Sequence, residues 1–228
     1  MATPVPDTHS RTRRILEDLE AVRENLLAFS DDIWLSIDHN DTDALEAGVQ
    51  FKRSDNEKFA AFDSLATDIS VLVQQFTSIN LVAAEQSGSE SASENERIIR
   101  ELDRDQPHTL NEDFRFKRPH GFILQERGTT GITTWKRLFE LIALQLLQRD
   151  PIRFRALVDH PDFISTRGHH SFNSSAVGLR FPLKLADDLF AEINLSANSI
   201  RDLIKRVLFV LDIPADGLKI FLREDRDA

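Results

Sequence analysis

A heptad spacing of apolar residues near the N-terminus is the strongest constraint on what this chain can fold into. From residue 11 onward, a set of large apolar side chains recurs at alternating intervals of four and three residues, with several acidic residues between them. This is the a/d rhythm of a helix whose seam faces another helix. The spacing predicts an amphipathic helix, and we expect six seam residues to mediate oligomerisation: Ile15, Leu19, Val22, Leu26, Phe29 and Ile33.

A second apolar pattern follows a polar break at residues 38–41. Asp41 or Thr42 can cap a new helix there, because its side-chain oxygen accepts from unpaired N–H groups in the first turn. Apolar residues then recur between Leu45 and Ile79, with a polar gap from Lys52 to Lys58. So short a break predicts an antiparallel hairpin of two helices. One long, locally interrupted helix is the alternative.

Two helices bury little apolar area by themselves, so their stripes need a further partner. We expect that partner to be a second copy of the chain, which makes the segment a coiled-coil arm of a homodimer. Two alternatives stay open at this point. The arm could pack on the rest of its own chain, or it could bind a different protein.

Charge divides the chain as clearly as the apolar pattern does. Residues 1–106 carry 10 Lys+Arg against 22 Asp+Glu, whereas residues 107–228 carry 18 against 16. Residues 85–96 hold no large apolar side chain that could offset the entropy of ordering. We therefore predict a helical arm at 11–84, a polar linker at 85–106 and a compact domain at 107–228.

The C-terminal part has the pattern of a mixed α+β domain. Short strands are expected on either side of a turn at 118–121, followed by a loop at 128–131. A buried helix at 135–148, capped by Thr133 or Thr134, precedes a second helix that starts at Pro151.

The second half of that domain begins with an irregular stretch at 161–185. A strand at 189–195, a helix ending near Leu211 and capped by Ser196 or Asn198, and a last strand at 218–222 complete it. The predicted order is ββαα(β)βαβ, which is an α+β rather than an alternating α/β arrangement.

Little in the sequence indicates a reaction. The absence of cysteine excludes disulfides, thiolate zinc sites, iron–sulfur clusters and a cysteine nucleophile. His169 and His170 are adjacent, so on an extended segment their rings point to opposite faces, and Ser165 and Ser171 lack a nucleophile elbow. We predict no catalytic residue, no metal ligand and no cofactor. A small hydrolase or nuclease that uses the His169/His170 region is an alternative.

Basic residues of the C-terminal domain are the better candidates for binding. Arg115, Lys117 and Arg118 alternate with Phe114 and Phe116, which on a strand would separate a cationic face from an apolar one. If such residues converge, they form a surface for phosphate groups. Routine pairing with local acids is an equally open interpretation. The predicted nucleic-acid-binding residues are Arg115, Lys117, Arg118, Arg153, Arg155, Arg167, Arg201 and Lys205.

Three text motifs lie in the C-terminal part: TGITTWKRLFELIALQLLQRDPIRF, DHPDFISTRGHHSF and FAEINLSANSIRDLIKRVL. With DDIWLSIDHNDTDALEAGVQFKR, they resemble uncharacterised bacterial proteins that pair an N-terminal helical segment with an α+β module. That module carries a Trp-led helix and an NLSANSI strand–helix junction. The resemblance implies a setting near mobile-element or antiviral, phage-defence genes, and so a role in binding nucleic acid or a partner protein.

These observations predict a non-enzymatic, self-associating binding or regulatory protein. The arm would oligomerise, and the α+β domain would bind DNA, other nucleic acid or protein. A purely protein–protein adaptor that acts through the arm is a further alternative. The first 14 residues lack the apolar region of a signal peptide, and no apolar run is long enough to span a membrane. We therefore expect a cytoplasmic protein without membrane contact.

Overall fold

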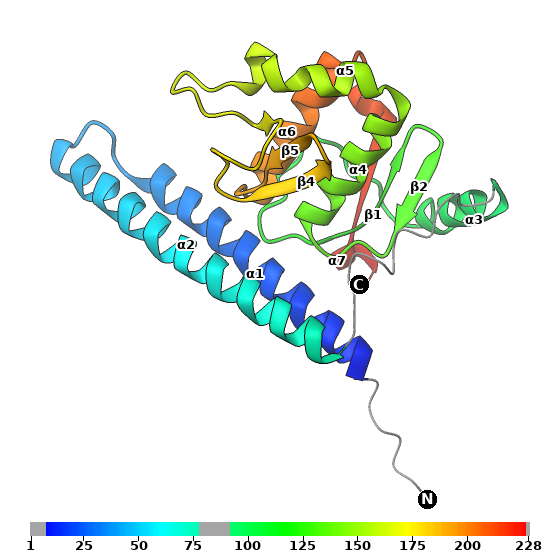
Figure 1. Cartoon of the computed structure of the whole chain (residues 1–228), viewed down its shortest axis with the longest axis horizontal. Coiled ribbons are helices and arrows are strands. Elements are labelled where there is room, and N and C mark those ends of the chain that lie inside the picture. The colour runs from blue at the N-terminus through cyan, green and yellow to red at the C-terminus, as the bar shows by residue number, and fades with distance from the viewer. Residues whose placement is uncertain (1–7, 78–91, 227–228) are drawn as a thin grey trace, which may run out of the picture. The chain divides into compact units, whose positions relative to one another are not determined.

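The computed structural model describes residues 8–77 and 92–226 (Figure 1). The chain separates into two compact units, Met1–Glu90 and Ser91–Ala228, which are described here one at a time.

The N-terminal unit is a pair of long helices, α1 (Thr8–Ser36) and α2 (Thr42–Thr77), which lie side by side (Figure 1). Asp41 is the predicted cap of the second helix, since its Oδ1 accepts from the N–H groups of Asp43 at 2.9 Å and of Ala44 at 3.2 Å. Residue 23 contacts residue 63 and residue 30 contacts residue 55, so the helices run antiparallel. The hairpin prediction is confirmed, and the single interrupted helix is excluded.

The C-terminal unit begins with a helix in the predicted linker. The linker was expected over 85–106, but α3 (Ala92–Leu102) occupies most of its second half; residues 85–91 lie outside the described residues. Ile98 and Leu102 of α3 pack against Ile123 and Phe221 in a small core. The linker prediction was wrong for residues 92–102. The segment starts with many Ser and Glu residues, and the apolar residues that make α3 amphipathic, Ile98 and Leu102, come only at its end.

A three-stranded antiparallel sheet lies beneath α3. Its order is β2 (Arg127–Thr130), β1 (Pro119–Leu124) and β6 (Leu218–Leu222). The side chain of Asn95 ties α3 to the edge strand, since it accepts from the N–H of Gly128 at 2.9 Å and donates to the carbonyl of Glu126 at 2.7 Å. The exposed edge of β2 is thereby covered.

The prediction of the first two strands was wrong in its positions. The chain reverses at Gln125, whose φ is 57°, rather than at 118–121, so the expected turn becomes the start of β1 and most of the expected loop at 128–131 becomes β2. No strand forms at Phe114 and Phe116: the segment is a turn in which Phe116 has a φ of 61°. Long-range contacts of this turn, described below, override its strand-like alternation.

Helices of the C-terminal unit follow the predictions closely. Thr134 caps α4 (Trp135–Arg149), and Pro151 starts α5 (Pro151–Arg155) directly after Asp150. Ser196 precedes α6 (Ala197–Val210) at the N-cap position. Short 3₁₀ turns and a last helical turn, α7, complete the described part of this unit: Ala156–Asp159, Pro161–Phe163, Ala215–Gly217 and Arg223–Arg226.

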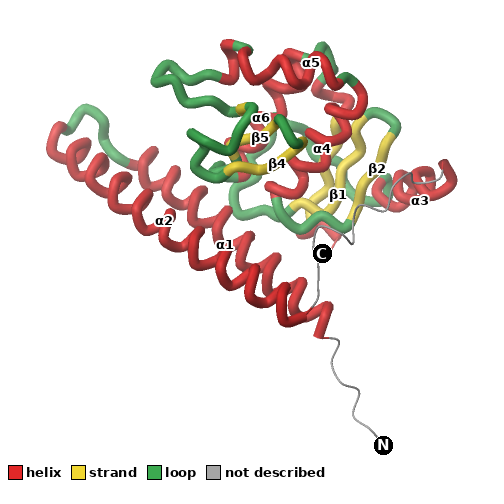
Figure 2. The backbone as a smooth tube through the Cα atoms, viewed as in Figure 1, coloured by secondary structure: helices red, strands yellow, loops and turns green. Residues whose placement is uncertain are grey.

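A second antiparallel sheet has the order β3 (Phe172–Asn173), β5 (Leu189–Glu192) and β4 (Pro182–Ala186) (Figure 2). The stretch expected to be irregular, 161–185, thus contains β3 and most of β4. The predicted strand at 189–195 ends at Glu192. After α3 the order is ββααβββαβ, so the α+β class is confirmed while the exact order is not.

The core of the C-terminal unit joins both sheets to α4 and α6. It centres on Trp135, Phe139 and Ile142 of α4 and on Ile200 and Leu203 of α6, all almost fully buried. Each sheet contributes alternate residues to it, while the other face of β1 and β6 packs against α3. Within residues 8–77 and 92–226, no helix combines the length and apolar character needed to cross a bilayer.

Gly121 of β1 leaves no room for a side chain. A Cβ there would lie 2.7 Å from Cδ2 of Leu102 and 2.8 Å from the carbonyl oxygen of Thr129. We expect Gly121→Ala to lower the free energy of unfolding by about 1–3 kcal/mol, as overpacking does. Urea unfolding of the full chain measures this. Gly217→Ala is the control, because its Cβ would meet only Cγ of Gln125 at 3.8 Å. Equal stability of both variants would contradict the assignment.

Candidate self-association surface

Charged groups occupy the interior of the N-terminal hairpin. Arg23 of α1 is 2% exposed, and its Nε donates to Oδ1 of Asp63 in α2 at 2.7 Å. The guanidinium carbon also lies 5.5 Å from the ring centre of Phe59. A buried arginine is stable only when its donors are paired, so this ion pair fixes which side of α1 faces α2.

A second polar group lies nearer the hairpin turn. The Ser30 hydroxyl donates to Oδ2 of Asp55 at 2.5 Å and accepts from Nζ of Lys52 at 2.7 Å. The same ammonium donates to Oδ1 of Asp31 at 3.2 Å. Together with Arg23, these contacts show that polar side chains join the two helices at two levels, between residues 23 and 31 of α1.

The six residues of the predicted seam lie to one side of this interior. At 3.6 residues per turn they are centred roughly 90° around α1 from the line through Arg23 and Ser30. Ile15 is 61% and Phe29 56% exposed, Val22 and Leu26 are also exposed, and the other two are half-buried. The helix and its apolar stripe were therefore predicted correctly, but the stripe does not face α2.

Three residues of α2 form a matching exposed stripe: Leu65, Ile69 and Leu72. They lie roughly 100–160° from the interior line, which on α2 runs through Asp63 and Phe59, so this stripe points partly away from α1. The two offsets have the same sense, and antiparallel helices then present both stripes on one side of the hairpin. Half-buried Phe62 adjoins them. We define the outer apolar face as Ile15, Leu19, Val22, Leu26, Phe29, Ile33, Phe62, Leu65, Ile69 and Leu72.

The outer apolar face is large for an exposed surface. Its exposed fractions, applied to ordinary side-chain areas, give roughly 700 Å² of apolar surface, above the few hundred Å² usual on a monomer. Two such faces together would bury about 1,400 Å², within the range of stable protein–protein interfaces. All ten members are apolar, although exposed Arg11 and Lys58 fall at the same angular positions on α1 and α2. The sequence placed these α2 residues in the same seam as Phe59, whereas Phe59 points inward.

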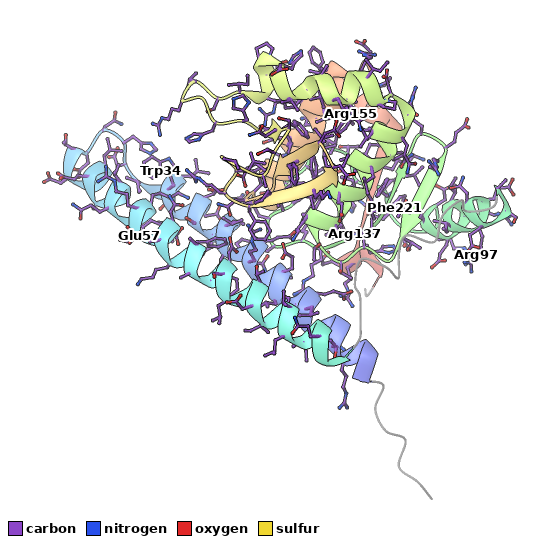
Figure 3. All side chains as sticks on the ribbon, in the orientation of Figure 1. Trp34, Glu57, Arg97, Arg137, Arg155 and Phe221 are labelled. Atoms are coloured by element: carbon purple, nitrogen blue, oxygen red, sulfur yellow. The ribbon has the colours of Figure 1, made fainter. Side chains whose placement is uncertain are left out.

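The predicted nucleic-acid-binding residues do not form one surface. Arg153 caps the end of α6, since its guanidinium donates to the carbonyls of Val210 and Leu211 and pairs with Asp212. Arg155, on α5 (Figure 3), pairs with Asp188 at 3.0 Å. Both arginines therefore have structural contacts, and no described contact links them to the other predicted residues.

Arg201 and Lys205 of α6 do meet the segment before β1. Nη1 of Arg201 donates to the carbonyl of Glu112 at 2.6 Å, and Nζ of Lys205 donates to Oδ1 of Asn111 at 2.9 Å. Arg115 of that segment binds Asp113 with both its Nε and Nη2. These hydrogen bonds from Arg115 hold the pKa of Asp113 well below its usual range.

The remaining predicted residues differ from one another in their surroundings. Lys117 and Arg118 follow Arg115 along the same segment and so stay close to it, whereas exposed Arg167 lies on the loop that leads to His169. The structure thus gathers five of the eight residues around the segment before β1: Arg115, Lys117, Arg118, Arg201 and Lys205.

Histidines of that loop lack the partners that acid–base chemistry needs. His170 Nδ1 lies 3.4 Å from the carbonyl oxygen of Val158, and the backbone N–H of His169 donates to the Ser165 hydroxyl at 3.0 Å. Neither ring contacts a carboxylate in the described part of the chain. The described residues also contain no group of three or more potential metal ligands. The geometry gives the hydrolase alternative no support.

Comparisons with known proteins give no match: not with a family model, a curated protein or a solved structure. The resemblance to bacterial proteins near defence genes therefore stays a prediction, and the functional argument depends on the geometry of the two units.

The Arg23–Asp63 pair allows a direct test of the hairpin interior. We expect Asp63→Asn to destabilise the N-terminal unit by about 2–3 kcal/mol, because it removes the carboxylate on α2 that pairs with the buried guanidinium and leaves the longer contact with Glu20 of the same helix, at 3.7 Å. Thermal unfolding followed by far-UV circular dichroism would show the loss of helix at lower temperature. Glu96→Gln is the control, since its pair with Arg100 is exposed on both sides and should contribute less than about 0.5 kcal/mol. An unchanged transition in Asp63→Asn would contradict the assigned interior.

Proposed function

We propose that this chain is a non-enzymatic, self-associating binding protein whose N-terminal hairpin pairs with the hairpin of a second copy. The observation that carries this proposal is the outer apolar face: ten apolar residues on one side of a hairpin whose interior contains a buried ion pair. A hairpin built to stand alone would place these residues between its helices. The reversed arrangement is typical of a helix pair that forms half of a larger bundle.

Two hairpins that meet through this face form a four-helix bundle. Because the same surface is used on both copies, the contact is isologous and closes as a twofold dimer. The outer apolar face of each hairpin then lies in the bundle centre, while the Arg23–Asp63 and Ser30–Asp55 contacts join the helices within each layer. The area of the face is sufficient for such a dimer.

The net charge of the hairpin predicts how dimerisation depends on salt. Residues 8–77 carry 7 Lys+Arg against 14 Asp+Glu, so two hairpins repel each other at long range. Salt screens that repulsion but leaves apolar burial intact. Dimerisation should therefore strengthen as the salt concentration rises. The C-terminal unit would be carried in two copies, which favours a binding role over a structural one for that unit.

Val22 lies near the middle of the outer apolar face and offers the sharpest variant. We expect the unmodified chain to have twice its monomer mass of 26.0 kDa in multi-angle light scattering. Val22→Glu should return it to monomer mass at the same concentration, because the charge would be buried at the contact.

Val71→Glu is the matched control. Val71 is an equally exposed apolar residue of α2, but it lies on the other side of the hairpin from the outer apolar face. This variant should stay dimeric and keep its helix content. A monomeric unmodified chain at all concentrations, or equal loss of the dimer in both variants, would contradict the proposed self-association.

A further inference from the structure

The turn before β1 displays one aromatic side chain to solvent. Phe116 is 52% exposed, and its φ of 61° places it in the left-handed region, which a bulky residue rarely adopts. Its neighbour Phe114 is fully buried, with its ring centre 4.7 Å from that of Trp135. Of two phenylalanines in one turn, the chain therefore buries one and exposes the other on a strained backbone.

Hydrogen bonds hold the turn on the side that precedes Phe116. The N–H of Phe114 donates to Oδ1 of Asn198 at 2.9 Å, and Nδ2 of Asn198 donates to Oδ1 of Asp113 at 2.9 Å. The N–H of Arg115 donates to the same Asp113 oxygen at 3.0 Å. Asn198, a residue of the NLSANSI motif, thus fixes this turn from α6.

The other side of Phe116 is held as firmly. Nε1 of Trp135 donates to the carbonyl of Lys117 at 2.8 Å, and the N–H of Arg118 donates to Oε1 of Glu224 at 3.0 Å. The strained conformation is thus imposed by contacts on both sides. Strain that the surrounding structure maintains at an exposed side chain is a mark of a functional position.

Basic residues lie next to Phe116 in the sequence and on the helix that binds this segment. Arg115, Lys117 and Arg118 flank Phe116 in sequence, and Arg201 and Lys205 are bound to the same segment. Asp113 offsets Arg115, and the Lys117 ammonium acts electrostatically on the Glu112 carboxylate, although no ion pair joins the two in the part of the chain that the structure describes. Residues 111–118 carry three basic and two acidic side chains, in a chain whose net charge is −10.

We propose that the turn at 113–118 binds single-stranded nucleic acid, with a base stacked on Phe116 and the adjacent phosphates near Lys117 and Arg118. An exposed aromatic ring with cations beside it is the combination that single-strand binding uses, since every base has a face to stack. A duplex offers no unstacked base to such a ring. The inference is independent of self-association, although a dimer would present two such turns on one strand.

The test uses the full chain, a fluorescent oligothymidine of about 20 nucleotides and the matching duplex, at low salt. Phe116→Gly removes the ring and, because glycine favours a positive φ, also relieves the strain. We expect its affinity for the single strand to fall about tenfold or more while the thermal midpoint of the C-terminal unit rises. Phe209→Ala is the matched control, because Phe209 is also an exposed phenylalanine, 78% exposed on α6. This variant should bind the single strand as tightly as the unmodified chain does.

The combined outcome separates a binding residue from a structural one. Weaker binding together with equal or higher stability in Phe116→Gly supports the proposal. The proposal is overturned if the unmodified chain binds no single strand at low salt or prefers the duplex. It is also overturned if Phe116→Gly and Phe209→Ala both bind the single strand as tightly as the unmodified chain does. A monomeric chain that still passes this test would contradict only the dimer.

Discussion

The ion pair between Arg23 and Asp63 determines which surface of α1 faces α2 and which surface faces outward. An arginine that is 2% exposed must keep its counter-charge, so α1 cannot rotate to bring its apolar stripe against α2. The contacts of Ser30 and Lys52 fix the same orientation nearer the turn. As a consequence, the most apolar surface of the hairpin points away from its own interior. In the dimer that we propose, a second copy covers this surface.

The C-terminal unit is built on the opposite principle. Its core joins both sheets to α4 and α6, and α3 covers the sheet edge through Asn95. This unit needs no partner to complete it, so its unusual features point to binding rather than to folding. Phe116 is the clearest of them, because a rigid framework holds a solvent-exposed ring in an unfavourable backbone conformation. In our proposals the first unit associates and the second presents a binding site.

Local signals were sufficient to predict most helices. Apolar spacing and the caps at Asp41 and Thr134 act within one or two turns, so the sequence shows them directly. The orientation of the seam could not be predicted, because it depends on a contact between residues 40 positions apart. The same holds for the turn at Phe116. Its alternating sequence is typical of a strand, but hydrogen bonds that join this segment to Asn198 and Trp135 hold it as a turn. Arg153 was predicted to bind nucleic acid, but its guanidinium caps the end of α6. The sequence does not distinguish these two uses of an arginine.

The central claim is that the outer apolar face of one copy covers that of another, and the distance between copies tests it most directly. The chain has no cysteine, so Asn25→Cys gives a single spin label beside the face. Helices packed in a bundle lie about 8–10 Å apart, and labels on two copies would then be within roughly 20–40 Å of each other. Double electron–electron resonance should show that distance in the unmodified background and lose it with Val22→Glu. No dipolar signal between copies at dimer-forming concentrations would contradict the claim.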